Sequence, residues 1–331
     1  MNVTVLSGGI GGARFVAGLR DALAAGDEPA RVTVIGNTAD DIWLFGLRVC
    51  PDLDTVMYTL GGGIDADRGW GRQDETWHAK EELAAYGVEP SWFGLGDRDL
   101  ATHVVRTQML GAGYPLSQVT EALCDRWDLG VRLIPMTDDR VETHVVIDDA
   151  AAPEGRRAVH FQEYWVRLHA PVAHAVVPVG ADEATPGPGV LEAITEADVV
   201  IFSPSNPVVS VATILAVPGT ADAVRATTAT VVGVSPIISG SPLRGMADRL
   251  LPVIGVDVTA SAVGRYYGAR SNGGLIDGWL VDESDGDTVP DLTATGIVAR
   301  AVPLYLSDPD TSRTLAEDVL QLASSIRRYA E

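Results

Sequence analysis

A glycine-rich segment near the start of the chain has the composition of an anion-binding loop. Gly8, Gly9, Gly11 and Gly12 lie within five positions, and Arg14 follows them. Glycine lets the backbone approach an anion closely, and free amides at the start of a helix favour negative charge there. We therefore expect this loop to bind a phosphate group. A tight strand-to-helix turn without a ligand is the alternative.

Acidic residues follow in two short segments. Asn37, Asp40 and Asp41 come after a β-rich run, and Asp52 and Asp54 precede an apolar helical run. Mg²⁺ takes carboxylate and phosphate oxygens and keeps some of its waters, so acids beside a phosphate loop suit it. Helix capping by the Asx side chains is the alternative. We expect Asp40, Asp41 and Asp54 to converge on one edge of a sheet.

Two further loops carry polar groups. Arg98 lies in a glycine-flanked charged loop, and its guanidinium has the fork geometry for a phosphate or a polar ring. Prolines fix the loop at 203–207, where Ser205 and Asn206 supply donors for a sugar, a base or a phosphate. A solvated arginine and a purely structural loop are the alternatives.

The sequence does not match several common classes of nucleotide-binding and metal site. A dinucleotide fingerprint needs Gly or Ala where Arg14 stands, and an acid where the second expected strand ends in Gly36 and Asn37. No Gly-Lys-Ser/Thr ending completes a Walker loop, and the six histidines lack metal-binding spacing. A dehydrogenase and a Walker-type nucleotide hydrolase are therefore disfavoured.

The elements that position these residues alternate between strands and helices, as in α/β proteins. A strand at 3–6, a helix at 14–25 and a strand at 31–35 form a βαβ unit. Buried strands at 198–202 and 231–234 also end in loops of small polar residues. Such loops lie at the carboxyl edge of a parallel sheet, where α/β proteins bind ligands.

The middle of the chain has a different pattern. Helical patterns are followed there by strand-like runs. We expect an α/β fold, with a Rossmann-like parallel sheet in residues 1–70 and 190–331 and an inserted, mixed helical and antiparallel lobe in residues 71–189. The expected helices are 75–86, 100–110 and 116–128, and the expected strands are 132–134, 144–147 and 158–160.

Composition limits the partners. The chain has 331 residues, and 45 acidic against 24 basic residues give a net charge of −21, which repels nucleic acid and anionic membranes at long range. Prolines interrupt the longest apolar region, around 199–217, so no membrane span is expected. Two cysteines and no recognisable export signal favour a cytoplasmic location.

Six motifs, in order along the chain, resemble the 2-phospho-L-lactate transferase family, the CofD and FbiA proteins of coenzyme F420 biosynthesis. The resemblance implies transfer of a phosphoenolpyruvyl or 2-phospho-L-lactyl group from a guanosine diphosphate ester to the hydroxyl of the deazaflavin FO, with release of GMP. It also implies Mg²⁺ and a homodimer. The motifs are residues 6–12, 37–41, 51–56, 96–99, 134–143 and 203–207.

By position, the resemblance implies that Asp54 and Arg98 contact FO. It assigns the guanine nucleotide to the 8–12 loop, with Arg14 and Asn37 beside it, and to Ser205 and Asn206. We infer Asp40, Asp41 and Asp54 as Mg²⁺ candidates, and Asp54 as the residue that orients the hydroxyl or accepts its proton if it is not a ligand. Ile10 and Arg14 stand where many relatives carry Thr and Lys.

A nonenzymatic regulator of the related YvcK type, which binds a nucleotide-sugar, is the alternative. Such proteins tend to have Gly-Gly-Ser-Ser-Gly after the paired acids, whereas Asp40 and Asp41 lead here into residues 42–46, Ile-Trp-Leu-Phe-Gly. This difference favours the transferase. Because Lys80 is the single lysine, we expect a GC-rich bacterial source and hence the phosphoenolpyruvyl donor.

Overall fold

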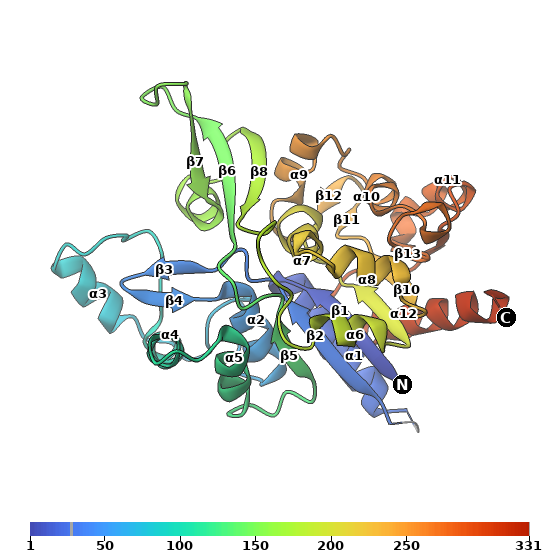
Figure 1. The fold of residues 1–331 in the computed structure, drawn as a ribbon, viewed down its shortest axis with the longest axis horizontal. Coiled ribbons are helices and arrows are strands. Elements are labelled where there is room, and N and C mark those ends of the chain that lie inside the picture. The colour runs from blue at the N-terminus through green and yellow to red at the C-terminus, as the bar shows by residue number, and fades with distance from the viewer. Residues whose placement is uncertain (27–28, 331) are drawn as a thin grey trace.

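The computed structural model describes residues 1–26 and 29–330. In this part of the chain, a seven-stranded sheet has the order β14-β13-β10-β9-β1-β2-β5, and every neighbouring pair is parallel (Figure 1). The predicted α/β class with a parallel sheet is confirmed. The strands are β1 (Asn2–Ser7), β2 (Arg31–Gly36), β5 (Arg132–Pro135), β9 (Val199–Phe202), β10 (Thr230–Val234), β13 (Gly278–Val281) and β14 (Val298–Ala301).

Helices cover both faces of this sheet, which is why its central strands read as continuous apolar runs. All residues of β9 and β10 are buried. One hydrophobic cluster joins the sheet to α1 (Gly9–Ala24), α2 (Pro51–Leu60) and α12 (Pro309–Ala330), and a second lies on the other face. The sheet therefore forms a rigid base for the loops at its carboxyl edge.

Helix α12 packs along α1 at close range. A Cβ atom on Gly18 of α1 would lie 2.3 Å from the backbone of Ser312 in α12. Only glycine permits this approach, because a real side chain would collide with the partner backbone. The C-terminal helix thus holds the first helix, and with it the glycine-rich loop, against the sheet.

The segments between β2 and β9 carry most of the added structure. After β2 come a hairpin, β3 (Ile42–Leu44) and β4 (Leu47–Val49), and three helices beyond α2, and then an antiparallel sheet that projects from the body (Figure 1). The helices are α3 (His78–Ala85), α4 (Asp97–Gly111) and α5 (Leu116–Cys124), and the projecting strands are β6 (Glu142–Asp148), β7 (Arg156–His160) and β8 (Ala173–Val179).

Strand β5 corrects one assignment. Its residues were expected in the inserted lobe 71–189, yet β5 pairs in parallel with β2 at the edge of the central sheet. A run of four residues offers no pattern by which to choose its partner, since pairing is a tertiary choice. The division of the chain into domains otherwise stays a prediction.

The remaining elements are short, and β11 and β12 pair in a small sheet of their own. They are η1 (Glu163–Arg167), α6 (Val190–Thr195), η2 (Pro207–Val211), α7 (Ala212–Ala216), α8 (Thr220–Ala226), β11 (Ile237–Ile238), β12 (Ser241–Pro242), α9 (Ala247–Leu250), η3 (Pro252–Ile254), α10 (Ala260–Tyr267), η4 (Arg270–Asn272), η5 (Glu283–Thr288) and α11 (Val289–Ala294). Among the described residues, no single helix is long and apolar enough to cross a membrane. The segments 207–216 and 220–226 meet that test only as a pair bent by 87°.

Candidate active site

A cavity of about 600 Å³ opens at the carboxyl edge of the sheet. Its wall combines the glycine-rich loop, the first turns of α2, the loops after β9 and β10, part of α4 and η1. Of the predicted site residues, the wall contains Gly8, Gly9, Gly11, Arg14, Asp40, Asp54, Ser205 and Asn206. It does not contain Gly12, Asn37, Asp41 or Arg98.

The glycine-rich loop packs directly on the loop after β9. A Cβ atom on Gly11 would lie 2.7 Å from the carbonyl oxygen of Pro204, and one on Gly12 would lie 2.5 Å from Oγ of Ser205. Two of the predicted glycines are therefore required by contact between two protein loops. The two loops predicted to share a ligand are neighbours.

Ser205 and Asn206 play different parts in that contact. Oγ of Ser205 accepts a hydrogen bond from the Gly8 amide (3.0 Å) and donates one to the Gly8 carbonyl (2.7 Å). Oδ1 of Asn206 accepts from the amide of Val208 (2.9 Å) at the start of η2. Nδ2 of Asn206 is buried without a partner. Ser205 thus holds the loop, and Asn206 keeps a donor for a ligand.

Asp52 is a wall residue that the sequence interpretation did not single out. Its carboxylate accepts hydrogen bonds from the Gly9 amide (2.8 Å) and from Nδ2 of Asn37 (2.9 Å). Burial raises the pKa of Asp52 to about 6, and these two hydrogen bonds oppose the rise. One of the two acids at the start of α2 was expected to cap that helix. Instead Asp52 binds the first amide of α1.

Asn37 supports this contact from below the cavity. It is fully buried, Nδ2 also donates to the Val209 carbonyl (3.1 Å), and Oδ1 accepts from Oγ1 of Thr213 (2.8 Å). The structure therefore places Asn37 as a support for Asp52 and η2, with its polar atoms already bonded. Its contact with a nucleotide stays a prediction.

The three Mg²⁺ candidates differ in their surroundings. Asp40 and Asp54 lie in the cavity wall, and each has one buried carboxylate oxygen without a hydrogen-bond partner, Oδ1 of Asp40 and Oδ2 of Asp54. Asp41 also has one such oxygen, Oδ1, but it lies outside the wall, and its Oδ2 forms a buried ion pair with Arg48 at 3.1 Å. Burial raises the pKa of Asp41 to about 6, which Arg48 counteracts.

These surroundings fit a cation held by two carboxylates better than one held by three. In residues 1–26 and 29–330 no group of three or more His, Cys, Asp or Glu side chains is arranged to hold a metal. Mg²⁺ commonly takes one or two carboxylates and completes its shell with substrate phosphates and water. Asp40 and Asp54 are the candidates left in the cavity wall, and each has a carboxylate oxygen without a hydrogen-bond partner.

Asp54 belongs to a buried polar cluster between α2 and α4. Arg106 donates to its Oδ1, and Nδ1 of His103 lies 3.7 Å from its Oδ2. Arg106 also contacts Nδ1 of His103 at 3.0 Å. The hydroxyl of Tyr58 donates to Oδ1 of Asp99 at 2.8 Å. Asp54, Tyr58, Asp99 and His103 line the cavity, and we call these four residues the α4 wall.

The spacing along α4 explains this cluster. Asp99, His103 and Arg106 are four and three residues apart, so they share one face of the helix. All three are buried. The sequence signal that would have identified them is their spacing, which places three polar residues on one face of a predicted helix.

Arg98 lies on another face of α4. Its guanidinium donates to the Gln73 carbonyl at 3.3 Å and lies 3.8 Å from Asp74, and half of its side chain is exposed. The neighbouring Asp99 lines the cavity instead. The contact of Arg98 with FO stays a prediction, and no wall position supports it.

Two arginines meet beside the glycine-rich loop. Arg14 donates to the Leu306 carbonyl at 3.1 Å, and Arg244 lies in the wall between β12 and α9. Burial and the nearby charge of Arg244 lower the pKa of Arg14. Among the described residues, no carboxylate oxygen lies within 4.0 Å of either guanidinium. We call Gly8, Gly9, Gly11, Arg14, Asn206 and Arg244 the glycine-loop wall.

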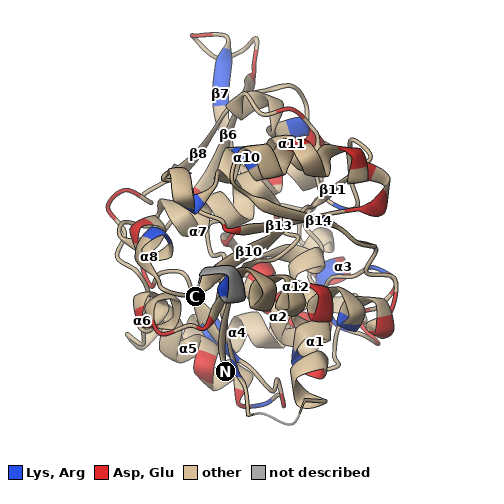
Figure 2. Ribbon diagram, turned by 90° about the vertical axis from the view of Figure 1, so that its right-hand side faces the viewer, with Lys and Arg blue, Asp and Glu red and all other residues tan. Residues whose placement is uncertain are grey.

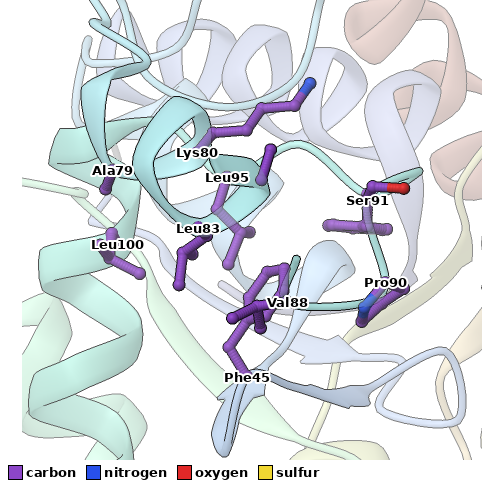
Figure 3. Close-up of a pocket in the computed structure, with 11 residues that line it drawn as sticks. Phe45, Ala79, Lys80, Leu83, Val88, Pro90, Ser91, Leu95 and Leu100 are labelled. Carbon is purple, nitrogen blue, oxygen red and sulfur yellow. The ribbon is translucent and has the colours of Figure 1, made fainter. Parts of the chain in front are cut away.

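A second, smaller cavity lies beneath α3, between that helix and the β3–β4 hairpin (Figure 3). Its volume is about 30 Å³, and Figure 3 shows Phe45, Leu83 and Leu95 pointing into it. This space holds about one water, which would need two or more polar partners. The cavity is a packing gap of the added segment, although Phe93 borders both it and the large cavity.

Comparison with known proteins identifies the family. The family model described as 2-phospho-L-lactate transferase CofD matches residues 3–295. A protein of Streptomyces coelicolor named phosphoenolpyruvate transferase is 63% identical over 328 residues, covering 99% of both chains. One of the same name from Thermobifida fusca is 61% identical over 332 residues, again covering 99% of both.

The crystal structure of protein BH3568 from Bacillus halodurans, described as a member of the UPF0052 family, is similar in fold. Its TM-score is 0.65 at 18% identity, with 96% of this chain and 99% of that chain covered. At this identity the similarity concerns the fold alone. The family match over most of the length and the relatives at more than 60% identity show that the chain belongs to the 2-phospho-L-lactate transferase CofD family.

Proposed function

We propose that this protein transfers a phosphoenolpyruvyl group from a guanosine diphosphate ester to the hydroxyl of FO, releasing GMP and forming dehydro-coenzyme F420-0. The names of the relatives at 61–63% identity support the phosphoenolpyruvyl donor over the 2-phospho-L-lactyl donor. The observation that carries the proposal is the cavity, because one part of its wall is cationic and another carries acids and a tyrosine. The nonenzymatic regulator is not favoured, because these relatives are named as transferases.

The glycine-loop wall suits the diphosphate. Arg14 and Arg244 are two like charges without a carboxylate partner, so an anion between them would relieve their repulsion. The fork of a guanidinium matches phosphate oxygens in geometry. Nδ2 of Asn206 is a free donor in the same wall. We assign the guanosine diphosphate to this wall, with GMP as the part that leaves.

The α4 wall suits the acceptor. The hydroxyl oxygen of FO attacks the phosphorus that bears the three-carbon acid, the bond from that phosphorus to the GMP oxygen breaks, and the hydroxyl proton leaves. Asp54 has one free carboxylate oxygen at the cavity with which to orient the hydroxyl or accept its proton. Phosphoryl transfer depends on this kind of positioning and on charge neutralisation more than on covalent chemistry by the protein.

We propose Asp40 and Asp54 as the residues that would hold Mg²⁺. When bound, the cation would supply neutralisation of the diphosphate charge. Asp41 is left out of this proposal because its side chain is paired with Arg48 away from the cavity. Where Asp54 ligates the cation, it does not accept the hydroxyl proton, so the two roles are alternatives.

Incubation of the purified protein with FO, Mg²⁺ and each donor tests the function. We expect GMP and dehydro-coenzyme F420-0 from the enolpyruvyl ester, detected by chromatography. Faster turnover of the lactyl ester would reverse the donor assignment, and no GMP from either donor would refute the transferase proposal. The homodimer and the cytoplasmic location are further expectations, and sedimentation of the purified protein tests the first.

A further inference from the structure

Arg106 is a buried cation that touches Asp54 from outside the cavity. Its side chain is 2% exposed and does not contribute to the wall. Nη2 donates to Oδ1 of Asp54, while Nη1 lies 3.0 Å from Nδ1 of His103 and 3.3 Å from the Arg48 carbonyl. A single guanidinium therefore holds two wall residues and the backbone of β4 at once.

The contact with Asp54 makes its two oxygens unequal. Oδ1 is bound by Arg106, whereas Oδ2 is buried without a hydrogen-bond partner. A carboxylate that could rotate freely would offer either oxygen to a ligand. With one oxygen held by the guanidinium, only Oδ2 is left for a substrate or a cation.

The contact with His103 determines where its ring carries a proton. Arg has only donors, so Nδ1 of His103 accepts the hydrogen bond from Arg106. A neutral ring whose Nδ1 accepts must carry its proton on Nε2. Nε2 lies 3.3 Å from Oδ1 of Asp99 without a regular hydrogen bond to it. His103 therefore presents an N–H group beside the cavity and has no free lone pair with which to act as a base.

We infer that Arg106 is the positioning residue of the α4 wall: it leaves Oδ2 of Asp54 as the reactive oxygen and holds His103 as an Nε2–H donor. This inference rests on the proposed function for its effect on turnover. The arrangement of the three side chains can be tested without any turnover.

The first test compares Arg106→Lys with Arg270→Lys. Lysine keeps the charge but lacks the fork, so it cannot serve Asp54, His103 and the Arg48 carbonyl together. Arg270 is a matched control, because its guanidinium binds the Thr227 and Ala229 carbonyls and Asp277 and touches no wall residue. Each variant loses the several hydrogen bonds that one guanidinium makes, from the buried Arg106 in the first case and from the mostly buried Arg270 in the second.

We expect Arg106→Lys to lower kcat about 100-fold, the effect of a displacement of about 1 Å at a reacting group. The KM for the guanosine diphosphate ester should stay within about twofold, and Arg270→Lys should lower Tm without this loss of kcat. An unchanged kcat in a folded Arg106→Lys protein would overturn the inference, as would a rise of the donor KM that exceeds the loss of kcat.

The second test uses the unmodified chain and stands even if Arg106→Lys does not fold. Nitrogen-15 NMR of protein labelled in histidine distinguishes the two neutral tautomers and the charged ring, and the signal missing from His103→Gln assigns the resonance. We expect His103 as the neutral Nε2–H form. A ring protonated on Nδ1 would refute the contact with Arg106. If the wild type forms no GMP but shows this tautomer, the proposed reaction fails while the assignment of Arg106 as the residue that holds His103 is supported.

Discussion

The two walls of the cavity differ in what they offer a ligand. The glycine-loop wall is made from backbone and small residues at the ends of β1 and β9, with cations added by Arg14 and Arg244. The α4 wall is made from large polar side chains on α2 and α4, held by the buried Arg106. The first is positioned by strands of the sheet, and the carboxylate of Asp52 already accepts a hydrogen bond from its Gly9 amide. The second depends on side-chain hydrogen bonds, so its geometry is more easily altered by substitution.

The difference is also one of charge. The chain as a whole carries −21, and Figure 2 shows acidic segments on several helices and loops of one face, with basic segments on β7 and interspersed among them. In the cavity Asp54 and Asp99 lie on α2 and α4, while Arg14 and Arg244 lie beside the glycine-rich loop, whose Gly9 amide is bonded to Asp52. The surface therefore repels polyanions at long range, while the glycine-loop wall attracts a small anion at short range.

The largest expected effect is that of Asp54→Asn in the α4 wall. Loss of the carboxylate removes the proposed orienting or ligating oxygen, so kcat should fall by about 100-fold or more. GMP release under saturating FO and donor measures this. Asp41→Asn provides the contrast, because Asp41 lies outside the wall. If Asp41→Asn lowered kcat as much as Asp54→Asn while the fold stayed intact, the choice of Asp40 and Asp54 over Asp41 would be wrong.

Substitutions in the glycine-loop wall should change the KM for the donor more than kcat. Arg14→Met and Arg244→Met each remove a proposed charge-assisted contact with the diphosphate, a contact typically worth about 1.5 to 3 kcal/mol. The donor KM should therefore rise about 10- to 100-fold, with a smaller change in the KM for FO. Initial rates over a range of each substrate separate the two. An effect confined to the KM for FO would place the arginines at the acceptor instead.

A third prediction concerns the backbone of the glycine-loop wall. In Gly11→Ala the new Cβ would lie 2.7 Å from the Pro204 carbonyl, so one of the two loops must shift. Overpacking of this kind costs about 1 to 3 kcal/mol of unfolding free energy, which urea denaturation can measure. Gly111→Ala at the end of α4 is the control, since no atom lies within 4 Å of its added Cβ. Equal stability of the two variants would show that the loops are not packed as described.

The difference between the two walls also explains which parts of the site could be predicted from the sequence. Local spacing at strand ends was enough to predict that the glycine-rich loop, Asp40 and the Ser205–Asn206 loop lie at one edge of the sheet, whereas Asp41 lies outside the wall of the cavity there. Their ligands stay predictions. Asp52 was read as one of two acids at a helix start, although it bonds to the amide of Gly9 on another helix. Arg106 was missed, because its role depends on a contact between α4 and α2. The two residues that form it, Arg106 and Asp54, are 52 positions apart in the sequence.

Arg98 and Asn37 show a different limit of sequence-based reasoning, although their predicted ligand contacts stay untested. Both have residue types suited to ligands, and both lie in segments next to the cavity. Yet the side chain of Arg98 points to the Gln73 carbonyl, and that of Asn37 is used fully within the protein. Residue type and neighbourhood identify a segment, whereas the direction of a side chain is decided by packing. Strand β5 was assigned to the added lobe for a related reason, because its pairing with β2 is also decided by tertiary packing and not by local sequence.

The smallest expected effect lies outside both walls, where His160 of β7 contacts the segment that carries Asp40 and Asp41. Nε2 of His160 lies 3.1 Å from the Asp41 carbonyl, and Nδ1 accepts from the Gln162 amide at 3.1 Å. The ring is therefore neutral with its proton on Nε2, and burial lowers the pKa of His160 below its ordinary value of 6.5.

Because the folded state disfavours the charged ring, the stabilisation due to His160 is present above the unfolded pKa near 6.5 and is lost as the pH falls below it. The loss is at most about 1.4 kcal/mol per pH unit. His160→Gln keeps a donor for the Asp41 carbonyl but cannot titrate, so the free energy of unfolding of the wild type should fall more steeply than that of the variant between pH 7.5 and 5.5. Urea denaturation at these pH values measures both slopes. Parallel slopes would mean that His160 does not hold the Asp40 segment as a neutral ring, and the support of that segment would then have to come from its other contacts.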